Sequence, residues 1–295
     1  MTEKRNILVV INPKAGKSSY QRQLNYLQAK LQVAQLNFQC FYTEYHGEKK
    51  LAEFLELNPH ITEIIVLGGD GTLNYVVNEI GTKSIVISIL SLGTGNDSVK
   101  SLHGESNFEK QVDIAIHGKI GKFDLGMCNG RAFVNGVGIG FDGEVVRVME
   151  EKKSKRGGRL DYLYTVLRIV AGYKEKKISF SMDGKAFERK ILLMTISNGT
   201  TFGGGFVINP FAKANDGFLN VCMLNEIKPL MRFWHLPKLK FGTHAKLKQA
   251  EFFLAKKIVI NSSDDVVAHL DGEAIGHPPF EISIVQDALR VRTSL

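Results

Sequence analysis

Residues 64–80 (IIVLGGDGTLNYVVNEI) restrict the fold more than any other part of the sequence, because three local signals follow one another without a gap. Residues 64–67 are a short apolar run of mostly β-branched side chains, which predicts a strand covered on both faces. The glycine turn GGDGT comes next, and from Leu73 onward apolar residues recur at helical spacing. The stretch therefore predicts a strand, a tight turn and a helix.

A turn of this kind can bind an anion. The unpaired backbone N–H groups and the positive end of the helix dipole point at the same place, and glycine lets the backbone approach a phosphate closely. Asp70 is the exception, because a carboxylate repels phosphate unless a cation or a network of donors lies between them. The stretch thus predicts a phosphate site with Mg²⁺ in or near it, although a plain βα turn with a surface aspartate would have the same sequence.

Further strands are predicted in the first half of the chain. Residues 6–11 (NILVVI) run into the turn NPKAGKS, and residues 84–92 (SIVISILSL) run into the turn GTGND. The first turn ends like a P-loop, but Ile11 occupies the place of that motif's first glycine, so the P-loop interpretation is rejected. A strand is also expected at residues 38–43, with helices at residues 20–33, 49–57 and 98–102. Such a succession predicts an open, mainly parallel sheet with its ligand at the carboxyl ends of the strands.

The pattern changes near Asp124. Helical spacing gives way to short strand-like runs separated by glycine, which is typical of an antiparallel β domain of the sandwich or barrel type. These runs cover residues 131–137, 177–182, 191–197, 218–224, 257–260 and 281–285. We therefore predict an α/β domain over residues 1–124 and a β-sandwich domain over residues 125–295, with the end of the chain packed back on the first domain.

The composition, with 44% hydrophobic and 23% charged residues among 295, is that of a soluble globular protein. The three cysteines are far apart and form no CxxC pair, which argues against a disulfide framework or structural zinc. No apolar run approaches the roughly 20 residues of a membrane-spanning helix, and the polar beginning MTEKRN is not a signal peptide. A cytoplasmic protein is expected.

The net charge of +8 belongs to the second half of the chain. Residues 1–125 carry 13 basic and 13 acidic side chains, so the whole surplus lies beyond them. It gathers in residues 147–177 and 228–257, where lysine and arginine are mixed with leucine and aromatic residues. Such segments suit contact with anionic lipid headgroups or another anionic surface. A helix packed on the β domain with a solvated basic face would have the same sequence.

Three loops in the second half could carry chemistry. The run GGGF at residues 203–206 is a lip over a site or a plain loop. The turn at residues 213–218 offers a carboxylate and main-chain carbonyls to a hard cation, although hairpin turns share its composition. The turn LDGE at residues 270–273 brings two carboxylates together, where one could act as a general base, but DGE turns are also common on surfaces.

Together these motifs resemble those of the diacylglycerol kinase catalytic domain family, which includes bacterial soluble lipid kinases and the sphingosine and ceramide kinases. The resemblance covers nearly the whole chain. It is carried by NPKAG (12–16), GGDGTLN (68–74), GTGND (93–97), FDLG (123–126), FGGGF (202–206), DGFL (216–219) and LDGE (270–273). GGDGT alone is shared with NAD kinases, whereas the later motifs in this order favour the lipid kinases.

The resemblance implies an NAD-kinase-like nucleotide domain followed by a β-sandwich domain, with ATP in the cleft between them. The residues it assigns to the nucleotide and the adjoining metal-linked network are Asn12, Pro13, Lys14, Ala15, Gly16, Thr43, Gly68, Gly69, Asp70, Gly71, Thr72, Leu73, Asn74, Thr94, Asp97 and Asp124. Asp271 and Glu273 match the acidic pair implicated in activating the lipid hydroxyl, and Glu273 is the first choice as proton acceptor.

The resemblance also implies a structural Mg²⁺ site at Lys213, Asp216 and Phe218, formed by the Asp216 carboxylate and two main-chain carbonyls. Asn215 departs from the pattern, because many relatives have a second acid there. Asparagine lowers the local negative charge and so weakens the predicted attraction for the cation.

The expected function is phosphoryl transfer from ATP, with Mg²⁺, to a lipid hydroxyl, most directly from diacylglycerol to phosphatidic acid. The expected partner is a lipid substrate at the anionic inner face of the membrane, where the protein would bind peripherally, and not nucleic acid. The alternatives are a kinase for phosphatidylglycerol, a sphingoid base or NAD, and an inactive nucleotide-binding regulator whose basic surface binds DNA or a membrane. An edge strand in the second domain could pair two copies into a homodimer.

Overall fold

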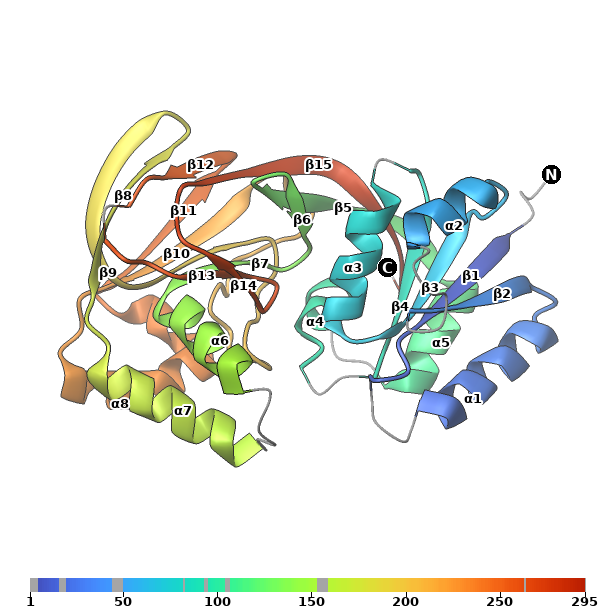
Figure 1. Cartoon of the computed structure of the whole chain (residues 1–295), viewed down its shortest axis with the longest axis horizontal. Helices are drawn as coiled ribbons and strands as arrows, with labels where there is room; N and C mark the ends of the chain where they lie inside the picture. The colour runs from blue at the N-terminus through green and yellow to red at the C-terminus, as the bar shows by residue number, and fades with distance from the viewer. Residues whose placement is uncertain are drawn as a thin grey trace. The chain divides into compact units, whose positions relative to one another are not determined.

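The computed structural model describes residues 5–15, 20–43, 50–81, 83–92, 95–103, 107–152, 159–262 and 264–294, with the side chains of residues 152 and 159–163 excepted. The chain divides into two compact units (Figure 1). Unit 1 comprises Met1–Asp124 and Gln286–Leu295, and unit 2 comprises Leu125–Val285.

Unit 1 is built on parallel strands. Their order is β2 (Asn37–Tyr42), β1 (Asn6–Ile11), β3 (Glu63–Gly68) and β4 (Val86–Ser91), and the end of β15 (Phe280–Thr293) pairs in parallel beside β4. The helices are α1 (Tyr20–Val33), α2 (Leu51–Leu57), α3 (Asp70–Ile80), α4 (Asp97–His103) and α5 (Phe108–His117). The predicted open parallel sheet is therefore confirmed, and the limits predicted for β1 and α1 match the structure.

Side-chain alternation along the strands explains how this sheet is covered. Every residue of β3 is buried, as expected of a strand with helices on both faces. One set of strand residues, which includes Ile7 and Ile65, packs with Leu27 of α1 and Val112 of α5. The intervening residues point to the opposite face, where α2 and α3 lie (Figure 1). The sequence patterns did not predict α5, which begins after Asn107, whose side chain accepts a hydrogen bond from the backbone of Lys110.

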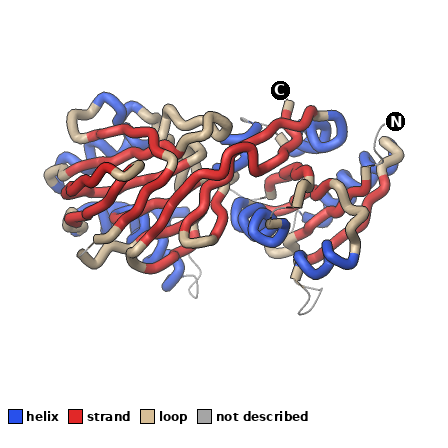
Figure 2. The backbone as a smooth tube through the Cα atoms, turned by 90° about the horizontal axis from the view of Figure 1, so that it is seen from above, coloured by secondary structure: helices blue, strands red, loops and turns tan. Residues whose placement is uncertain are grey.

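The strands of unit 2 pair in antiparallel fashion, as predicted, and run side by side (Figure 2). The main path is β14 (Glu273–Gly276), β13 (Ala268–Leu270), β7 (Gly136–Gly140), β9 (Lys185–Ser197), β8 (Lys176–Met182), β12 (Lys257–Ile260) and the first part of β15. β10 (Leu219–Asn225) joins β9 to β11 (Ala250–Ala255), and β6 (Arg131–Phe133) pairs with the end of β5 (Lys119–Cys128).

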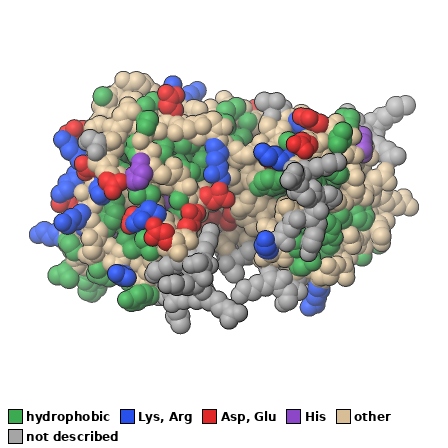
Figure 3. Space-filling view, in the orientation of Figure 1, with side chains coloured by type: hydrophobic (Ala, Val, Ile, Leu, Met, Phe, Trp, Pro, Cys, Tyr) green, Lys and Arg blue, Asp and Glu red, His purple; other side chains and the backbone are tan. Residues whose placement is uncertain are grey.

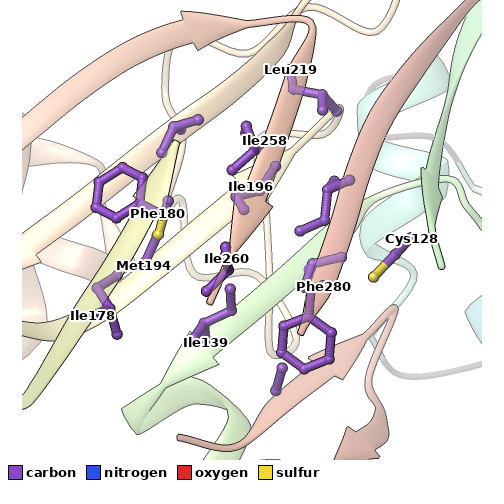
Figure 4. Packing of buried hydrophobic residues seen from close by; sticks show 14 of the residues in the cluster. Cys128, Ile139, Ile178, Phe180, Met194, Ile196, Leu219, Ile258, Ile260 and Phe280 are labelled. Atoms are coloured by element: carbon purple, nitrogen blue, oxygen red, sulfur yellow. The ribbon is translucent and has the colours of Figure 1, made fainter. Parts of the chain in front are cut away.

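The core of unit 2 lies among these strands. Phe180, Met194, Ile196, Ile258 and Phe280 belong to one buried cluster, and Figure 4 shows their side chains gathered among the strands. Strand residues that contribute to this cluster alternate with residues that point elsewhere, and this alternation fixes the strand register.

Helices form a second layer on unit 2. α6 (Phe141–Lys152), α7 (Arg159–Gly172) and α8 (Pro229–Lys240) lie together below the strands in Figure 1. They share a second buried cluster with the sheet, which includes Val145, Val166, Leu193 and Leu239. The basic segment at residues 147–177 thus contains the end of α6 and the whole of α7. The second basic segment contains α8, a short 3₁₀ helix (Thr243–Lys246) and β11. Among the residues described, no helix has the length and apolar character needed to span a membrane.

The end of the chain is tied to unit 1 by a buried ion pair. The Arg292 guanidinium donates to both carboxylate oxygens of Glu63 at 2.9 and 2.6 Å. Arg5 donates to the same two oxygens at 2.8 and 2.9 Å. One carboxylate on β3 therefore joins the first described residue of the chain to its last strand.

Candidate functional site

The predicted phosphate-binding turn lies where β3 ends and α3 begins. Gly69 precedes α3 in an extended conformation, and no side chain caps the start of the helix. A Cβ added to Gly68 would lie 2.4 Å from the Oγ1 atom of Thr72, so only glycine lets that side chain fold back over the end of the strand. Asn12 in turn donates from its side chain to Thr72 Oγ1 at 3.0 Å. The turn after β1 is thereby attached to the turn after β3.

Gly71 differs from Gly68 in its surroundings. A Cβ added there would meet no atom within 4 Å. This open space lies in the first turn of α3, where the backbone N–H groups and the helix dipole favour a negative charge. The geometry of the turn is therefore suited to a phosphate group.

Asp70 connects the two glycine turns recognised in the sequence. Its carboxylate accepts hydrogen bonds from the backbone N–H groups of Asp97 at 3.1 Å and Ser98 at 3.0 Å, at the start of α4. Asp97 is itself buried, with its carboxylate 3.9 Å from Lys100 Nζ. The Asp70 carboxylate thus lies against the backbone of a second acidic residue at the carboxyl ends of β3 and β4, and carboxylates supply the hard oxygen ligands that a cation such as Mg²⁺ prefers. Thr94 lies outside the described residues.

The other residues assigned to the nucleotide occupy several environments. The turn Asn12, Pro13, Lys14 and Ala15 is fixed by the backbone N–H of Lys14, which donates to the Asn12 side chain at 3.0 Å. The backbone N–H of Thr43 donates to the carbonyl of Ile11, which brings the end of β2 beside this turn. Gly16 is outside the described residues.

Leu73, Asn74 and Asp124 are also buried. Leu73 and Asn74 are 1% and 3% exposed within α3, so they support the helix from its inner side. Asp124 is 1% exposed in β5 and accepts a hydrogen bond from the backbone N–H of Asp287 at 2.9 Å. Asp124 therefore holds β15 where that strand enters unit 1.

In unit 2, Asp271 is the anchor of the LDGE turn. Its carboxylate accepts hydrogen bonds from the backbone N–H groups of Val134 at 2.8 Å, Asn135 at 3.0 Å and Gly136 at 2.8 Å. Asp271 itself has a positive φ of 46°. An aspartate tolerates this conformation better than most residues, and three charge-assisted hydrogen bonds offset its strain.

Glu273 has a different role in the same turn. Its side chain is half exposed and forms an ion pair with Arg131 of β6. The next residue, Ala274, donates its backbone N–H to Glu150 of α6 at 3.2 Å. Of the two acids predicted from the sequence, one is therefore held by backbone amides and the other carries an accessible carboxylate.

A buried histidine, which was not predicted as a site residue, supports this turn. The backbone N–H of Gly272 donates to His269 Nδ1 at 3.3 Å, which leaves the ring proton on Nε2. His269 Nε2 faces the Asp142 carboxylate at 3.0 Å. A Cβ on Gly138 would lie 2.2 Å from Nε2 and 2.3 Å from the Asp142 oxygen, so this pair requires glycine in β7. The sequence signal for this pair was Asp142, in GIGFDG, which lies two residues after the end of the glycine-rich strand β7.

An apolar cavity lies next to this histidine. Its lining comes from α6, α7, β9, α8 and the FGGGF loop, and includes Val145, Val166, Leu193, Phe202 and Leu239, with Asp142 as its charged member. The ring centroids of Phe202 and His269 are 6.4 Å apart in an edge-to-face arrangement. The FGGGF loop thus contributes wall residues to a cavity, and Asp142 and His269 connect that cavity to the LDGE turn.

The predicted cation turn offers the Asp216 carboxylate and backbone carbonyls as oxygen donors. Asp216 Oδ1 accepts a hydrogen bond from the backbone N–H of Phe218 at 3.1 Å, a turn-forming contact. Lys213 and Asp216 both border a hollow that Asn220 also lines. Across the described parts of the chain, no three His, Cys, Asp or Glu side chains come together as a metal site. A carboxylate with carbonyl oxygens remains a donor set suited to Mg²⁺ or Ca²⁺.

Comparison with known proteins agrees with this arrangement. Residues 6–128 match the diacylglycerol kinase catalytic domain, and residues 135–293 match the YegS C-terminal NAD kinase beta sandwich-like domain. A diacylglycerol kinase of Staphylococcus carnosus is 27% identical over 97% of this chain and 94% of its own length. A diacylglycerol kinase of Staphylococcus aureus is 28% identical over 92% of this chain and 87% of its own length.

Solved structures share the fold. The crystal structure of a diacylglycerol kinase from Bacillus anthracis superposes with a TM-score of 0.74, at 21% identity, over 99% of this chain and 97% of that one. A second Bacillus anthracis structure has a TM-score of 0.80 at 23% identity, over 99% and 98% of the two chains. On the two domain matches, the motif order and the fold, the chain belongs to the diacylglycerol kinase catalytic domain family, with a YegS-type β-sandwich as its C-terminal domain.

Proposed function

We propose that this protein is a lipid kinase that uses ATP and Mg²⁺ to phosphorylate a lipid hydroxyl, with diacylglycerol as the preferred acceptor and phosphatidic acid as the product. Membership of the family supports a kinase and ATP as the donor. The relatives named above are diacylglycerol kinases, which supports the choice of acceptor.

The observation that carries the lipid part of the proposal is the connected set of contacts in unit 2. An apolar cavity ends at Asp142, Asp142 faces His269, and His269 accepts from the backbone of the LDGE turn. A lipid acceptor has an apolar body and one hydroxyl to be activated. Apolar side chains next to an acidic turn present both kinds of surface in one unit.

Glu273 is the better proton acceptor of the two acids. The Asp271 carboxylate accepts hydrogen bonds from three backbone N–H groups, so Asp271 is suited to positioning the turn. The half-exposed carboxylate of Glu273 can take the proton of the lipid hydroxyl while the hydroxyl oxygen attacks the phosphoryl group.

In unit 1, the turn at Gly69 and Gly71 would hold phosphates of ATP, with Asn12 and Thr72 fixing the adjoining turn. Asp70 and Asp97 would face the metal-linked network, and Asp216 would belong to the second cation site. ATP supplies the phosphoryl group when bound, and Mg²⁺ neutralises its charge. The chain's own contribution is to orient the phosphates by backbone donors and to keep the start of α4 attached to α3.

The test is ATP consumption by the purified protein with Mg²⁺ and mixed micelles that contain diacylglycerol, phosphatidylglycerol, sphingosine or no added lipid. Glu273→Gln should abolish diacylglycerol-dependent turnover. Glu281→Gln is the matched control, because Glu281 is also an exposed acid of unit 2 with a basic partner, Lys257 at 3.7 Å, and should retain activity. Turnover on a different lipid alone would replace the acceptor, and ATP binding without turnover on any lipid would overturn the kinase assignment. Unchanged activity in Glu273→Gln would remove this residue as proton acceptor.

A further inference from the structure

α8 displays a row of large apolar side chains to solvent. Leu230 is 82% exposed, Trp234 80% and Phe241, directly after the helix, 75%. Phe233 and Met231 are also exposed, at 40% and 45%. Scattered exposed apolar residues are normal, but a contiguous group of this size on one helix marks an interaction surface.

These side chains share one face of the helix. At 3.6 residues per turn, Leu230, Trp234 and Phe241 fall within an arc of about 40°. The opposite face is buried and includes Arg232, His235 and Leu239. The apolar residues are therefore exposed because the opposite face of α8 packs against unit 2.

Arg232 fixes that packing. Arg232 is 3% exposed. Its guanidinium donates to the carbonyls of Ile227 and Val170 at 2.9 Å and of Tyr173 at 2.7 Å, and it also pairs with Glu175. Four contacts with neighbouring segments hold the helix in one orientation. Rotation of α8 to bury Trp234 would leave the Arg232 charge without these partners, at a large cost.

The segment that carries this face has charges of one sign. Residues 228–248 contain six basic side chains and no Asp or Glu. Arg232 is used inside the protein, which leaves Lys228, Lys238, Lys240, Lys246 and Lys248. Lys238 and Lys240 lie in the last turn of the helix. One is on each side of the apolar arc, about 80° around the helix axis from Leu230. Figure 3 shows hydrophobic and basic side chains at the lower edge of unit 2, on the side of α7.

The inner side of α8 borders the apolar cavity. Leu236 and Leu239 contribute to the cavity wall together with the FGGGF loop. Lys240 extends over the Phe206 ring of that loop, with its Nζ 5.1 Å from the ring centroid. The helix that carries the exposed aromatic face thus also forms part of the wall of the site where a lipid acceptor would enter.

We propose that the outer face of α8, formed by Leu230, Phe233, Trp234 and Phe241 with the flanking lysines, docks on an anionic lipid bilayer. An aromatic and aliphatic face bordered by lysine suits the boundary between headgroups and acyl chains. The absence of acids from residues 228–248 provides charge complementarity to anionic headgroups. Docking gives the cavity access to a lipid substrate, and in this respect the inference rests on the proposed function.

Trp234 reports the docking directly, because it is the only tryptophan in the sequence. The full chain would be titrated with vesicles of phosphatidylcholine alone and of phosphatidylcholine mixed with phosphatidylglycerol. Entry of the indole into the bilayer should shift its emission to shorter wavelength with the anionic vesicles, and added salt should weaken the binding. Absence of any shift or co-sedimentation with anionic vesicles would overturn the proposal.

The variant that tests the face is Leu230→Glu with Phe241→Glu, which preserves the tryptophan. We expect a loss of about tenfold or more in affinity for anionic vesicles. The matched control is Val33→Glu with Leu57→Glu, which places two acids at exposed apolar helical positions of unit 1, 83% and 70% exposed, and should bind as the parent does. Equal weakening by both pairs would indicate a general charge effect and overturn the assignment to α8. The proposal would also be overturned if the parent protein formed a dimer without vesicles and only the Leu230→Glu, Phe241→Glu double variant were monomeric. The face would then bind a second copy of the chain.

Failure of this inference can be separated from failure of the proposed function. Turnover is measured on a short-chain diacylglycerol dispersed as monomers and on the long-chain lipid in anionic vesicles. The double variant Leu230→Glu, Phe241→Glu should retain turnover on the dispersed acceptor and lose it on vesicles. Vesicle binding by a parent protein that phosphorylates neither acceptor would support docking and contradict the kinase proposal. Equal loss of turnover on both acceptors would place the α8 residues in the catalytic machinery and overturn their role in docking.

Discussion

The carboxylate of Asp70 accepts a hydrogen bond from the backbone N–H of Ser98 at 3.0 Å, across 28 residues of sequence. Its other oxygen accepts from the N–H of Asp97. An acid in the first turn of α3 therefore caps the beginning of α4, and the two glycine turns that follow β3 and β4 are held together by one side chain. This bridging role accounts for an acid beside the turn proposed to bind phosphate.

Replacement of Asp70 by asparagine should separate the two turns. Asparagine has one acceptor oxygen in place of two, and its NH₂ group would face a backbone N–H, so at least one of the hydrogen bonds is lost. We expect a loss of about 1–3 kcal/mol in the free energy of unfolding and a clear loss of affinity for ATP. Urea unfolding and calorimetric titration with ATP measure the two effects.

Asp113→Asn in α5 is the control for Asp70→Asn, because the Asp113 side chain is 72% exposed and its carboxylate pairs with His117, which is also exposed. It should leave the free energy of unfolding within about 0.5 kcal/mol of the parent value. Equal effects of the two substitutions would contradict the bridging role of Asp70.

Gly68 and Gly71 should respond to alanine in opposite ways. A Cβ on Gly68 would lie 2.4 Å from Thr72 Oγ1, so Gly68→Ala should displace Thr72, break its contact with Asn12 and destabilise the protein by about 1–3 kcal/mol. Gly71→Ala meets no protein atom within 4 Å, and alanine favours a helix, so the fold should be retained or slightly stabilised.

The open space at Gly71 is the place proposed for a phosphate, so Gly71→Ala should weaken ATP binding despite its intact fold. We expect a rise of about tenfold in the dissociation constant, equivalent to roughly 1.4 kcal/mol. Thermal unfolding and ATP titration of the same two variants separate stability from binding. Normal ATP affinity in a folded Gly71→Ala protein would place the phosphates elsewhere.

Gly138→Ala should disturb the LDGE turn from the other side of His269. The new Cβ would lie within 2.3 Å of both His269 Nε2 and the Asp142 oxygen, and neither group can move without losing a buried contact. We expect a loss of about 1–3 kcal/mol in stability and reduced turnover with ATP binding unchanged. Gly172→Ala in α7 is the matched control, since its Cβ would meet no atom within 4 Å. Wild-type turnover in Gly138→Ala would show that the His269–Asp142 pair does not support the turn.

The sequence predicted local structure well where apolar periodicity was unbroken. The limits of β1 and α1 were correct, since NILVVI has no polar interruption and Leu24, Leu27 and Leu31 repeat at helical spacing. α5 was not predicted, because its buried face includes the polar Gln111, whose side chain bonds to Ser91 of β4.

The candidate site was predictable to a similar extent. Parallel strands bring their carboxyl ends to one edge, so the neighbourhood of GGDGT and GTGND followed from the fold. The pairing of Asp142 with His269 did not, because it depends on how α6 packs against β7 and β13, and no local pattern encodes that contact. The same holds for Glu273 and Arg131, which lie on strands far apart in sequence.

Glu63 should make the stability of unit 1 sensitive to acid. Burial raises the pKa of its carboxyl group, but hydrogen bonds and attraction from Arg292 and Arg5 outweigh burial and hold the pKa below its ordinary value. A carboxyl group with a lowered pKa stabilises the fold above its unfolded-state pKa of about 4.3, and that contribution is lost as the pH falls through the folded-state value. Unfolding should therefore become markedly easier below about pH 4.

Glu63→Gln tests this dependence, because it removes the charge and leaves Arg5 and Arg292 with no carboxylate partner at this position. At pH 7 the free energy of unfolding of the variant should be about 3 kcal/mol lower than that of the parent. The difference should shrink as the pH falls, since the parent then loses the same charge by protonation. Glu56→Gln, at an exposed position of α2, should show no such convergence. Urea unfolding at several pH values measures all three proteins, and a difference between parent and Glu63→Gln that stays constant from neutral to acid pH would contradict the assignment.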